Sequence, residues 1–314
     1  MPNTFLSSTT ITAVALERLR RALILPNLVT RYGLSDFRGQ ANDTINVRVP
    51  AILRAREYTF RTRSAPIVID TLEEVSIPVA LDRHPYSAVA VTDEELTLDI
   101  VSFTQQVLEP QVIAVAEELE AIIAAIMAAG TYAAAPVPYN EDPGSSNFYA
   151  AAVDARRVLN DAHVPLDGRT LLIGSAIEAG ALKEDTLRAV DQSGSTGALR
   201  NATIGQVAGF TVVASQSVDP NFGIAFHRSA FAFGNVAPEV PAGVPFGSSQ
   251  NQDGLAMRWI RDYDATMLQD RSVVNSFAGG ASVEDGRDED SGGQPGPLNG
   301  TNVRAVLLDF TPAS

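Results

Sequence analysis

Histidine, serine and carboxylate side chains are the groups of this chain that could bind a metal ion or take part in catalysis. The three histidines, His84, His163 and His227, lie far apart, and none has a second histidine at the spacing that brings two metal ligands together on a helix. Ser175 is predicted to cap a helix rather than to act as a nucleophile, because no G-x-S-x-G motif surrounds it. Cysteine is absent, and Lys183 is the only lysine. The sequence therefore predicts no catalytic residue, no metal site and no cofactor.

Two further stretches are similar to ligand-binding motifs but depart from them. Residues Asp191 to Gly197 (DQSGSTG) are rich in glycine, yet they match neither phosphate-binding pattern, G-x-x-x-x-G-K-[ST] or G-x-G-x-x-G. Residues Glu284 to Asp290 (EDGRDED) are acidic, yet they do not fit the calcium-loop pattern. We therefore expect a loop at the first stretch and a solvated tip at the second.

Arginine and aromatic residues are interleaved between residues 51 and 66 (AILRAREYTFRTRSAP). Such a stretch can bind single-stranded nucleic acid by stacking beside a charged groove. It can also form the tip of a β-hairpin that contacts an acidic surface, and we favour this interpretation because acidic residues follow in the same chain. The candidate contact residues are Arg54, Arg56, Arg61 and Arg63 on the tip, and Glu73, Glu74, Glu117, Glu118 and Glu120 on the acidic side.

Charge is divided unevenly along the chain. Residues 1–63 hold ten arginines against four acids, residues 64–130 hold one arginine against twelve acids, and the whole chain has a formal net charge of −14. Opposite charge in consecutive segments indicates that the two dock, either within a subunit or between neighbouring subunits. The alternative is two solvated faces of opposite sign. The acidic total argues against tight binding of nucleic acid through its phosphates.

The composition, with 45% hydrophobic and 19% charged residues, is that of a globular protein. Its 314 residues are enough for about two domains. The first ten residues lack the basic segment and apolar run of a signal peptide, and no apolar stretch reaches the ~18 uncharged residues that a membrane helix needs. We therefore expect a soluble protein with no membrane span.

A long helix between Val101 and Ala129 is the element that must organise the chain. Pro110 is predicted to open this helix or to kink it against a preceding turn from Phe103, and Gly130 is predicted to close it. From Pro110 to Ala129 it would be about 30 Å long, enough to cross a domain. Eight apolar residues follow the spacing of one helix face: Val112, Val115, Ala116, Leu119, Ile122, Ile123, Ile126 and Met127.

Shorter elements precede the long helix. An amphipathic helix is predicted from Thr10 to Leu25, where Pro26 ends it, and it needs a surface to lie on because a short helix is only marginally stable alone. Thr92 and Glu95 have the spacing of a capping box. Alternating apolar residues predict strands at Thr44–Val49, Ile67–Ile69, Val75–Leu81 and Ser87–Val91.

After the long helix, a Pro- and Gly-rich break precedes alternating helices and strands that predict one compact mixed α/β domain. Gly254 to Tyr263 and Val273 to Phe277 predict strands that return to the long helix, and Val303 to Phe310 predicts a final strand. In the mixed domain the predicted helices are Phe148–Ala162 and Ser175–Leu182, and the predicted strands are Thr170–Ile173, Phe210–Ala214, Ile224–His227 and Phe231–Phe233.

The order of these parts resembles the major capsid (coat) protein of tailed double-stranded DNA phages, in particular the branch related to the coat protein of the Salmonella podovirus. Five phrases carry the resemblance: VLEPQVIAVAEELEAII in the long helix, then VPLDGRTLLIG, LRNATIGQVAGFTVVAS, AFHRSAFAFGNVAPEVP and GLAMRWIRDYDATMLQDRSVVNSFAG. The resemblance implies the α+β HK97-like capsid fold. Its parts would be an N-arm at residues 1–40, an E-loop hairpin at 41–92, a P-domain with the long spine helix at 93–147, a mixed α/β A-domain at 148–250, and returning P-domain strands with a C-terminal strand at 251–314.

The resemblance also implies a function. The chain would be a structural subunit that self-assembles through hexamers and pentamers into an icosahedral shell, with the E-loop of one subunit lying across the P-domain of its neighbour. The shell would enclose phage double-stranded DNA without sequence-specific binding, and it would reside in the virion after assembly in the host cytoplasm. The implied partners are further copies of the chain, a scaffolding protein, a portal protein and, as an option, a decoration protein.

Two departures from relatives modify these expectations. The hairpin begins near residue 41, so we expect a separate scaffolding protein rather than a long cleaved segment. The E-loop has no lysine, so we expect a shell without covalent crosslinks. Two alternatives stay open: an encapsulin-type compartment shell, which shares the fold and carries cargo enzymes, and a soluble α+β hydrolase with an unrecognised site.

Overall fold

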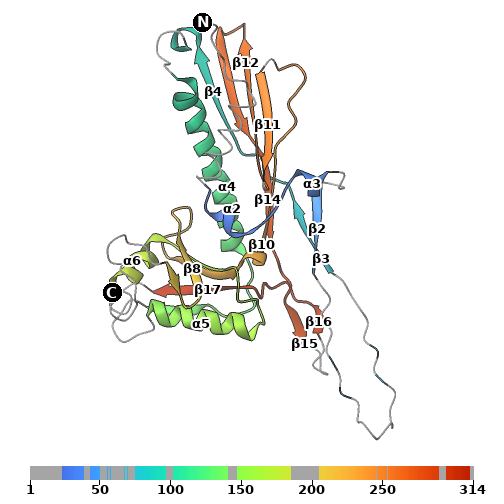
Figure 1. Ribbon diagram of the computed structural model, residues 1–314, viewed down its shortest axis with the longest axis vertical. Helices are drawn as coiled ribbons and strands as arrows, with labels where there is room; N and C mark the ends of the chain where they lie inside the picture. Colours follow the sequence, from blue (N-terminus) through green and yellow to red (C-terminus); the bar gives the residue numbers. More distant parts are fainter. Residues whose placement is uncertain are drawn as a thin grey trace.

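The structure is a computed structural model of the chain. It describes residues 23–38, 43–49, 75–96, 102–140, 147–184, 205–244, 246–252, 254–289 and 295–311, together with residues 55, 57, 67 and 69. The described part is elongated, with one long helix beside a sheet at one end and a second sheet with its helices at the other (Figure 1). Within this part, no helix is long and apolar enough to cross a membrane.

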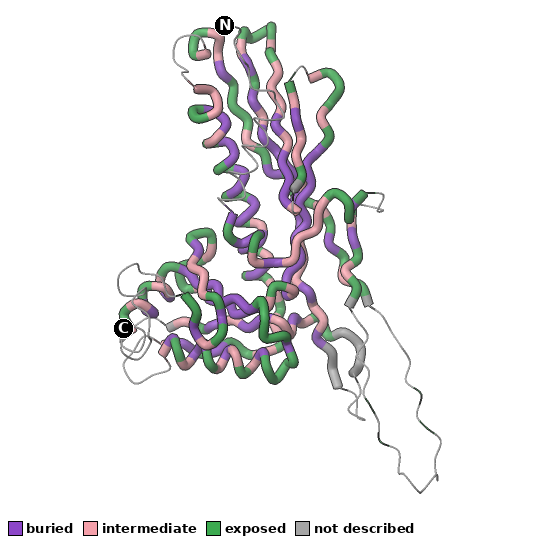
Figure 2. Tube along the Cα trace, viewed as in Figure 1, coloured by how far each residue is buried: buried purple, intermediate pink, exposed green. Residues whose placement is uncertain are grey.

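The long helix, α4, runs from Glu109 to Ala129 and follows a π-helical turn, η3, from Thr104 to Leu108. Pro110 lies in the first turn of α4, so the helix continues from a preceding helical turn, which is one of the two predicted arrangements. Six of the eight predicted apolar residues are buried, and Ile122 and Ile126 pack at the edge of the same core. Figure 2 shows buried residues recurring along α4 and along the strands beside it.

Four antiparallel strands lie beside α4 in the order β11-β12-β13-β4. Met257, Trp259 and Val274 of this sheet are buried in the same hydrophobic cluster as α4, which confirms that the late strands return to the long helix. The predicted capping box is also confirmed, because the Thr92 N–H donates to Glu95 at 3.0 Å and the Glu95 N–H donates to Thr92 Oγ1 at 3.3 Å. The strands are β4 (Tyr86–Thr92), β11 (Phe246–Gln252), β12 (Leu255–Asp264) and β13 (Gln269–Asn275).

Gln111 fixes α4 to this sheet. Its Nε2 donates to the carbonyl of Ser87 at 3.1 Å and to the carbonyl of Ser272 at 2.9 Å, and its Oε1 accepts from Ser272 Oγ at 2.7 Å. The indole N–H of Trp259 donates to the same Ser272 Oγ at 3.0 Å. Gln111 is only 2% exposed, so its amide replaces the water that these strand carbonyls would otherwise need.

A mixed six-stranded sheet forms the second large layer, in the order β5-β17-β9-β6-β8-β7. Helix α5 (Phe148–Asp161) runs along this sheet (Figure 1), and helix α6 (Ser175–Lys183) follows β6. Phe148, Leu171 and Phe210 belong to its hydrophobic cluster. The two predicted helices and three of the four predicted strands are found here, but the predicted strand Phe231–Phe233 belongs to a different, three-stranded sheet. The strands are β5 (Val137–Asn140), β6 (Arg169–Ile173), β7 (Gln206–Val207), β8 (Phe210–Ala214), β9 (Phe222–His227) and β17 (Ala305–Thr311).

Smaller elements connect the two layers. A three-stranded sheet has the order β1-β10-β14, and a hairpin of β2 and β3 lies to the side of α4 (Figure 1). Phe37, Ile45 and Val79 belong to a small third cluster that holds this hairpin against the body. The elements are α2 (Leu25–Leu28), β1 (Thr30–Tyr32), α3 (Leu34–Phe37), β2 (Thr44–Val49), β3 (Val75–Ala80), β10 (Phe231–Val236), the short 3₁₀ turn η4 (Arg228–Ala230), β14 (Phe277–Ser282), β15 (Arg287–Glu289) and β16 (Pro295–Leu298).

Two predictions at helix ends were wrong. Pro26 does not end a helix but lies in the first turn of α2, where a missing N–H costs no hydrogen bond. Residues 10–22 of the predicted first helix lie outside the described residues. Ser175 is the first residue of α6 rather than its N-cap, which is Gly174. A side chain at Gly174 would collide with the carbonyls of Asp219 and Pro220, so the close approach of the chain selects glycine there.

Two other predictions need adjustment. Gly130 ends α4 as predicted, but with an extended backbone (φ −63°, ψ 145°) rather than a left-handed one. An added β-carbon at Gly130 would lie 2.8 Å from the Tyr132 hydroxyl, so space rather than backbone freedom selects glycine there. No strand is formed by Ile67 and Ile69, the described residues of one predicted strand, which are 71% and 85% exposed.

The sheets do not follow the predicted part limits. Most of β11 lies within the range predicted for the A-domain, residues 148–250, but this strand pairs with β12 beside α4. β5 and β17 lie outside that range, but they belong to the six-stranded sheet. The chain therefore leaves and re-enters each layer, and the five sequence ranges stay a prediction.

The Gln111→Leu variant is expected to lower the free energy of unfolding by about 1–3 kcal/mol, because the buried carbonyls of Ser87 and Ser272 lose their donor. Urea unfolding curves measure the effect. Glu118→Gln, on the exposed face of the same helix, is the control and should change the free energy by less than about 0.5 kcal/mol. Equal losses in the two variants would contradict the role of Gln111.

Candidate assembly interface

The outer face of α4 carries both charge and apolar surface. Glu117 and Glu118 are exposed, and Ile113 is 49% exposed. Because successive helix residues are about 100° apart, these side chains point away from the stripe of Val115 and Leu119 that enters the core. The outer face therefore combines two of the predicted contact residues with an accessible aliphatic side chain.

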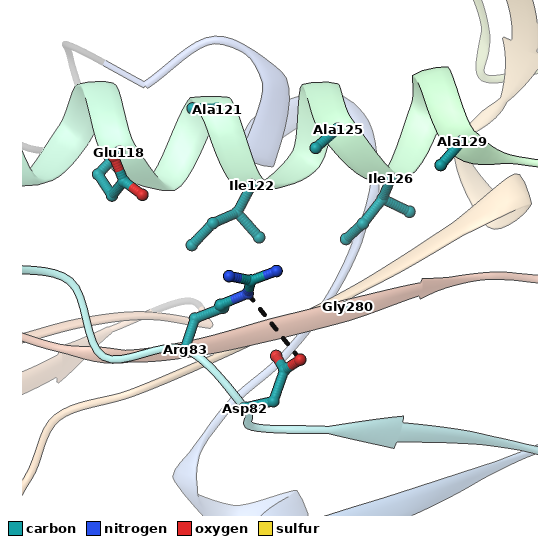
Figure 3. Close-up of a pocket in the computed structure, with 9 residues that line it drawn as sticks. All are labelled: Asp82, Arg83, Glu118, Ala121, Ile122, Ala125, Ile126, Ala129 and Gly280. Atoms are coloured by element: carbon teal, nitrogen blue, oxygen red, sulfur yellow. Dashed lines mark ion pairs between the residues drawn. The ribbon is translucent and has the colours of Figure 1, made fainter.

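A groove of about 370 Å³ runs along one side of α4, and we call it the hairpin-side groove because its other wall is the link between β3 and β4. Figure 3 shows Ile122 and Ile126 pointing from α4 toward that wall, with the guanidinium of Arg83 below Ile122. Arg83 Nε lies 3.9 Å from Asp82 Oδ2, and both side chains are 67% exposed. This ion pair therefore contributes little to the stability of the subunit. Glu118 borders this groove.

A second groove, of about 400 Å³, lies on the other side of α4, and we call it the arm-side groove. Its wall on α4 is formed by Ile113, Ala116 and Glu117, and its opposite wall by residues 214–217. Ile24, the second residue of the described chain, also lines this groove. Glu117 and Glu118 are neighbours in sequence but border different grooves, because a helix separates consecutive side chains by about 100°.

Glu120 differs from the two other predicted glutamates of α4. It is 5% exposed, and its carboxylate is used within the chain. Oε1 accepts from the backbone N–H groups of Ile24 and of Leu25, the latter at 3.2 Å, and Oε2 accepts from Ser217 Oγ at 2.6 Å. These N–H groups open α2, so Glu120 caps a short helix and links it to the loop after β8. We therefore assign Glu120 to the interior of the subunit.

The predicted contact residues are divided by the structure as follows. Glu117 and Glu118 are exposed on the outer face of α4, and Glu120 is buried. No pair of an arginine and a glutamate from the predicted set is brought together within the described residues. The other members of the set lie outside the described residues: Arg54, Arg56, Arg61, Arg63, Glu73 and Glu74.

A partly buried polar junction between η4, the residues after β14 and the residue before β17 was missed by sequence reasoning. Arg304 donates from Nε to Asp285 at 2.7 Å and from an Nη to Ser229 Oγ at 2.8 Å, and Ser229 Oγ lies 2.8 Å from His227 Nδ1. The side chain of Asp285 is only 9% exposed, so the prediction of a solvated tip is wrong at this residue, because the ion pair draws it inside. No local signal could have revealed a partner 19 residues away.

Two of the histidines have a pKa below the ordinary value. Burial is the main cause that lowers the pKa of His227, while the carboxylate of Asp167 opposes the shift. Burial and the nearby Arg258 lower the pKa of His84, whose ring lies 4.7 Å from that of Phe277. Among the residues that the structure describes, no group of three His, Asp or Glu side chains could hold a metal ion.

Comparison with known proteins decides the family. A family model described as "Phage capsid protein" matches residues 74–276, which is more than half of the chain. The chain belongs to the phage capsid protein family. Its role is structural, as a capsid protein of the virion. No curated protein matches the sequence.

Solved structures share the fold over nearly the whole chain. A structure from Mycobacterium phage Che8 is 17% identical with a TM-score of 0.64 and covers 91% of both chains. The capsid of Cyanophage P-SCSP1u is 11% identical with a TM-score of 0.63, covering 93% of this chain and 89% of that one. The mature capsid of bacteriophage PhiM1 is 10% identical with a TM-score of 0.61, covering 99% and 90%. At these identities the likeness shows the fold alone, and it is the predicted α+β HK97-like capsid fold.

The Glu120→Ala variant tests the assignment of this residue to the interior. It should lower the free energy of unfolding by at least about 2 kcal/mol, because the N–H groups of Ile24 and Leu25 lose a charged acceptor inside the protein. Glu117→Ala is the matched control and should change it by less than about 0.5 kcal/mol. Chemical denaturation of the soluble subunit measures both, and a larger loss for Glu117→Ala would contradict the assignment.

Proposed function

We propose that this capsid protein self-assembles through hexamers and pentamers into an icosahedral shell that encloses phage double-stranded DNA. The observation that carries the proposal is the family match from residue 74 to residue 276, which includes α4 and strands of both large sheets. The net charge of −14 suits a shell that contains DNA without holding it by its phosphates. Assembly would take place in the host cytoplasm.

The proposed contact joins the E-loop of one subunit to the spine helix of its neighbour. Support comes from the hairpin of β2 and β3 at the side of the body (Figure 1) and from the exposed Glu117 and Glu118 on α4. The arginines of residues 54–63 would meet these carboxylates. One exposed ion pair contributes roughly 0.2–1 kcal/mol, so no single pair holds the shell. Many weak contacts in a closed symmetric lattice can hold a shell and still release misplaced subunits.

The parts and partners of the subunit follow from the same proposal. Residues 1–40 would serve as N-arm, 41–92 as E-loop, 93–147 with 251–314 as P-domain and C-terminal strand, and 148–250 as A-domain. A separate scaffolding protein would guide assembly, a portal protein would occupy one vertex, and a decoration protein is an optional addition. The relation to the Salmonella podovirus branch stays a prediction that rests on the sequence phrases alone.

The alternatives are weaker. The family match names a phage capsid protein, which favours a virion shell over an encapsulin-type compartment. It likewise favours a structural subunit over a soluble α+β hydrolase. A portal or terminase gene next to the coding sequence would separate the phage shell from the compartment.

Electron microscopy of the purified protein is the direct test of the proposed function. The protein is expressed alone and together with the adjacent scaffolding gene, and each preparation is viewed in negative stain. We expect closed shells, or free hexamers and pentamers, in at least one preparation. Dispersed monomers under both conditions would contradict the proposal.

Reversal of the four E-loop arginines tests the proposed contact. A variant with Arg54, Arg56, Arg61 and Arg63 all changed to Glu should stay monomeric, because like charges would face Glu117 and Glu118. Circular dichroism checks that the monomer is folded, and sedimentation measures assembly. The control variant carries Lys at the same four positions and should assemble, because it keeps the charge. Normal shells from the Glu variant would rule out this contact.

A further inference from the structure

We propose that the turn of Asn299 and Gly300 is a site of self-catalysed modification, where the side-chain amide of Asn299 becomes a carboxylate. The turn lies between β16 and β17, and both residues are exposed. The inference goes beyond the capsid function and does not depend on it, since it concerns the chemistry of one turn. Three observations carry it: the residue pair itself, two donors on the amide oxygen, and a carboxylate beside the glycine.

Asn299 and Gly300 form the only Asn–Gly pair in the sequence. The backbone of Gly300 is left-handed, with a φ of 70°, a conformation that glycine adopts without strain. Because glycine has no β-carbon, the preceding side chain can approach its backbone nitrogen without a steric barrier. A bond between this nitrogen and Asn299 Cγ closes a five-membered ring, so the two reacting atoms are already held within one short stretch of chain.

Thr301 donates two hydrogen bonds to the side-chain oxygen of Asn299. Its backbone N–H lies 3.2 Å and its hydroxyl 2.7 Å from Asn299 Oδ1. When a nucleophile adds to Asn299 Cγ, this oxygen gains negative charge, and hydrogen bonds to a charged oxygen are roughly twice as strong as those to a neutral one. The two donors therefore stabilise the tetrahedral intermediate more than the amide, as an oxyanion hole does.

Gly286, between β14 and β15, holds this arrangement in place. The Asn299 N–H donates to the Gly286 carbonyl at 2.9 Å, and the Gly286 N–H donates to the Thr301 carbonyl at 2.8 Å. A β-carbon added at Gly286 would lie 2.6 Å from Asn299 Oδ1, so a side chain there would displace the amide from its donors. The donors and the amide oxygen are thus preorganised by a second segment of the chain.

Glu284 supplies a base beside the glycine. Its Oε2 lies 3.9 Å from the position that a β-carbon of Gly300 would occupy. A carboxylate there can accept the proton of the Gly300 N–H, either directly or through one water molecule. The turn therefore combines a nucleophilic nitrogen, a base and an oxyanion hole.

The reaction consumes water and releases ammonia. Glu284 takes the proton of Gly300 N, this nitrogen bonds to Asn299 Cγ, and the bond from Cγ to Nδ2 breaks as Nδ2 leaves with the proton as ammonia. Water then opens the cyclic imide at one of its two ring C–N bonds, which gives aspartate or its β-linked isomer. Either product adds one negative charge to the exposed turn.

Peptide mass spectrometry of the ageing subunit tests the proposal. The purified protein is kept in mildly alkaline buffer, and samples taken over time are digested. We expect the peptide that holds Asn299 to gain about one dalton, with part of the product β-linked in electron-transfer fragmentation. Asn221 is exposed but is followed by the bulky Phe222, so it is the internal control and should stay unchanged in the same samples.

Variants of the donor and of the base test the roles of the turn residues. Thr301→Val loses the hydroxyl donor and should slow the conversion about three- to tenfold, while Thr301→Ser keeps the hydroxyl and should retain the rate. Glu284→Gln should also slow it. Thr266→Val is the matched control, because Thr266 makes the same pair of hydrogen bonds to Asp264 in another turn, and it should leave the rate unchanged. Circular dichroism checks that each variant is folded.

Two outcomes overturn the proposal. An Asn299 that stays intact in the folded subunit but converts in the guanidinium-unfolded chain would show that the turn protects the amide. Equal rates for the folded subunit, the unfolded chain and Thr301→Val would show that the Asn–Gly pair reacts without help from the turn. Shell formation is scored separately by electron microscopy, so failure of this inference leaves the capsid function untouched.

Discussion

Burial of one face of α4 is the interaction on which the rest of the structure depends. A helix of this kind gains most of its stability from packing rather than from its own hydrogen bonds. Its core residues share one hydrophobic cluster with Phe226 of β9, Phe231 of β10 and Trp259 of β12, which lie in three different sheets. Separation of these sheets would expose the face of α4, at about 1.5–3 kcal/mol for each large aliphatic or aromatic side chain. The helix therefore sets the relative position of the layers.

Buried polar residues make this packing specific. Gln111 and Glu120 interrupt the apolar face of α4, and each is fully used: Gln111 by strand carbonyls and Glu120 by backbone N–H groups and Ser217. A buried polar group without its partners is costly, so alternative positions of the helix that break these bonds are disfavoured. Asn302 plays a similar part near the end of α4, where it is fully buried and donates to the carbonyl of Ala230 at 2.8 Å.

The surface follows a different rule from the interior. Exposed pairs such as Asp82 with Arg83 are long and solvated, and they add little to the stability of one subunit. A shell built from repeated contacts needs weak ion pairs between its subunits, because strong contacts would trap wrongly placed subunits. Buried hydrogen-bond networks keep the shape of the subunit, while the ion pairs on its surface stay weak enough for assembly to be reversible.

The sequence by itself determined the elements of this protein. Residue spacing predicts α4 and its buried stripe, most of the strands and the capping box of Thr92 and Glu95, because each depends on residues within a few positions. Only the tertiary structure decided which polar residues are buried. Glu117, Glu118 and Glu120 look alike in the sequence, yet Glu120 alone meets N–H groups about 95 residues away. Asp285 lies in an acidic run typical of a solvated tip, yet Arg304 draws it inside. The reason is physical: burial of a charge depends on its partner, and these partners are distant in the chain.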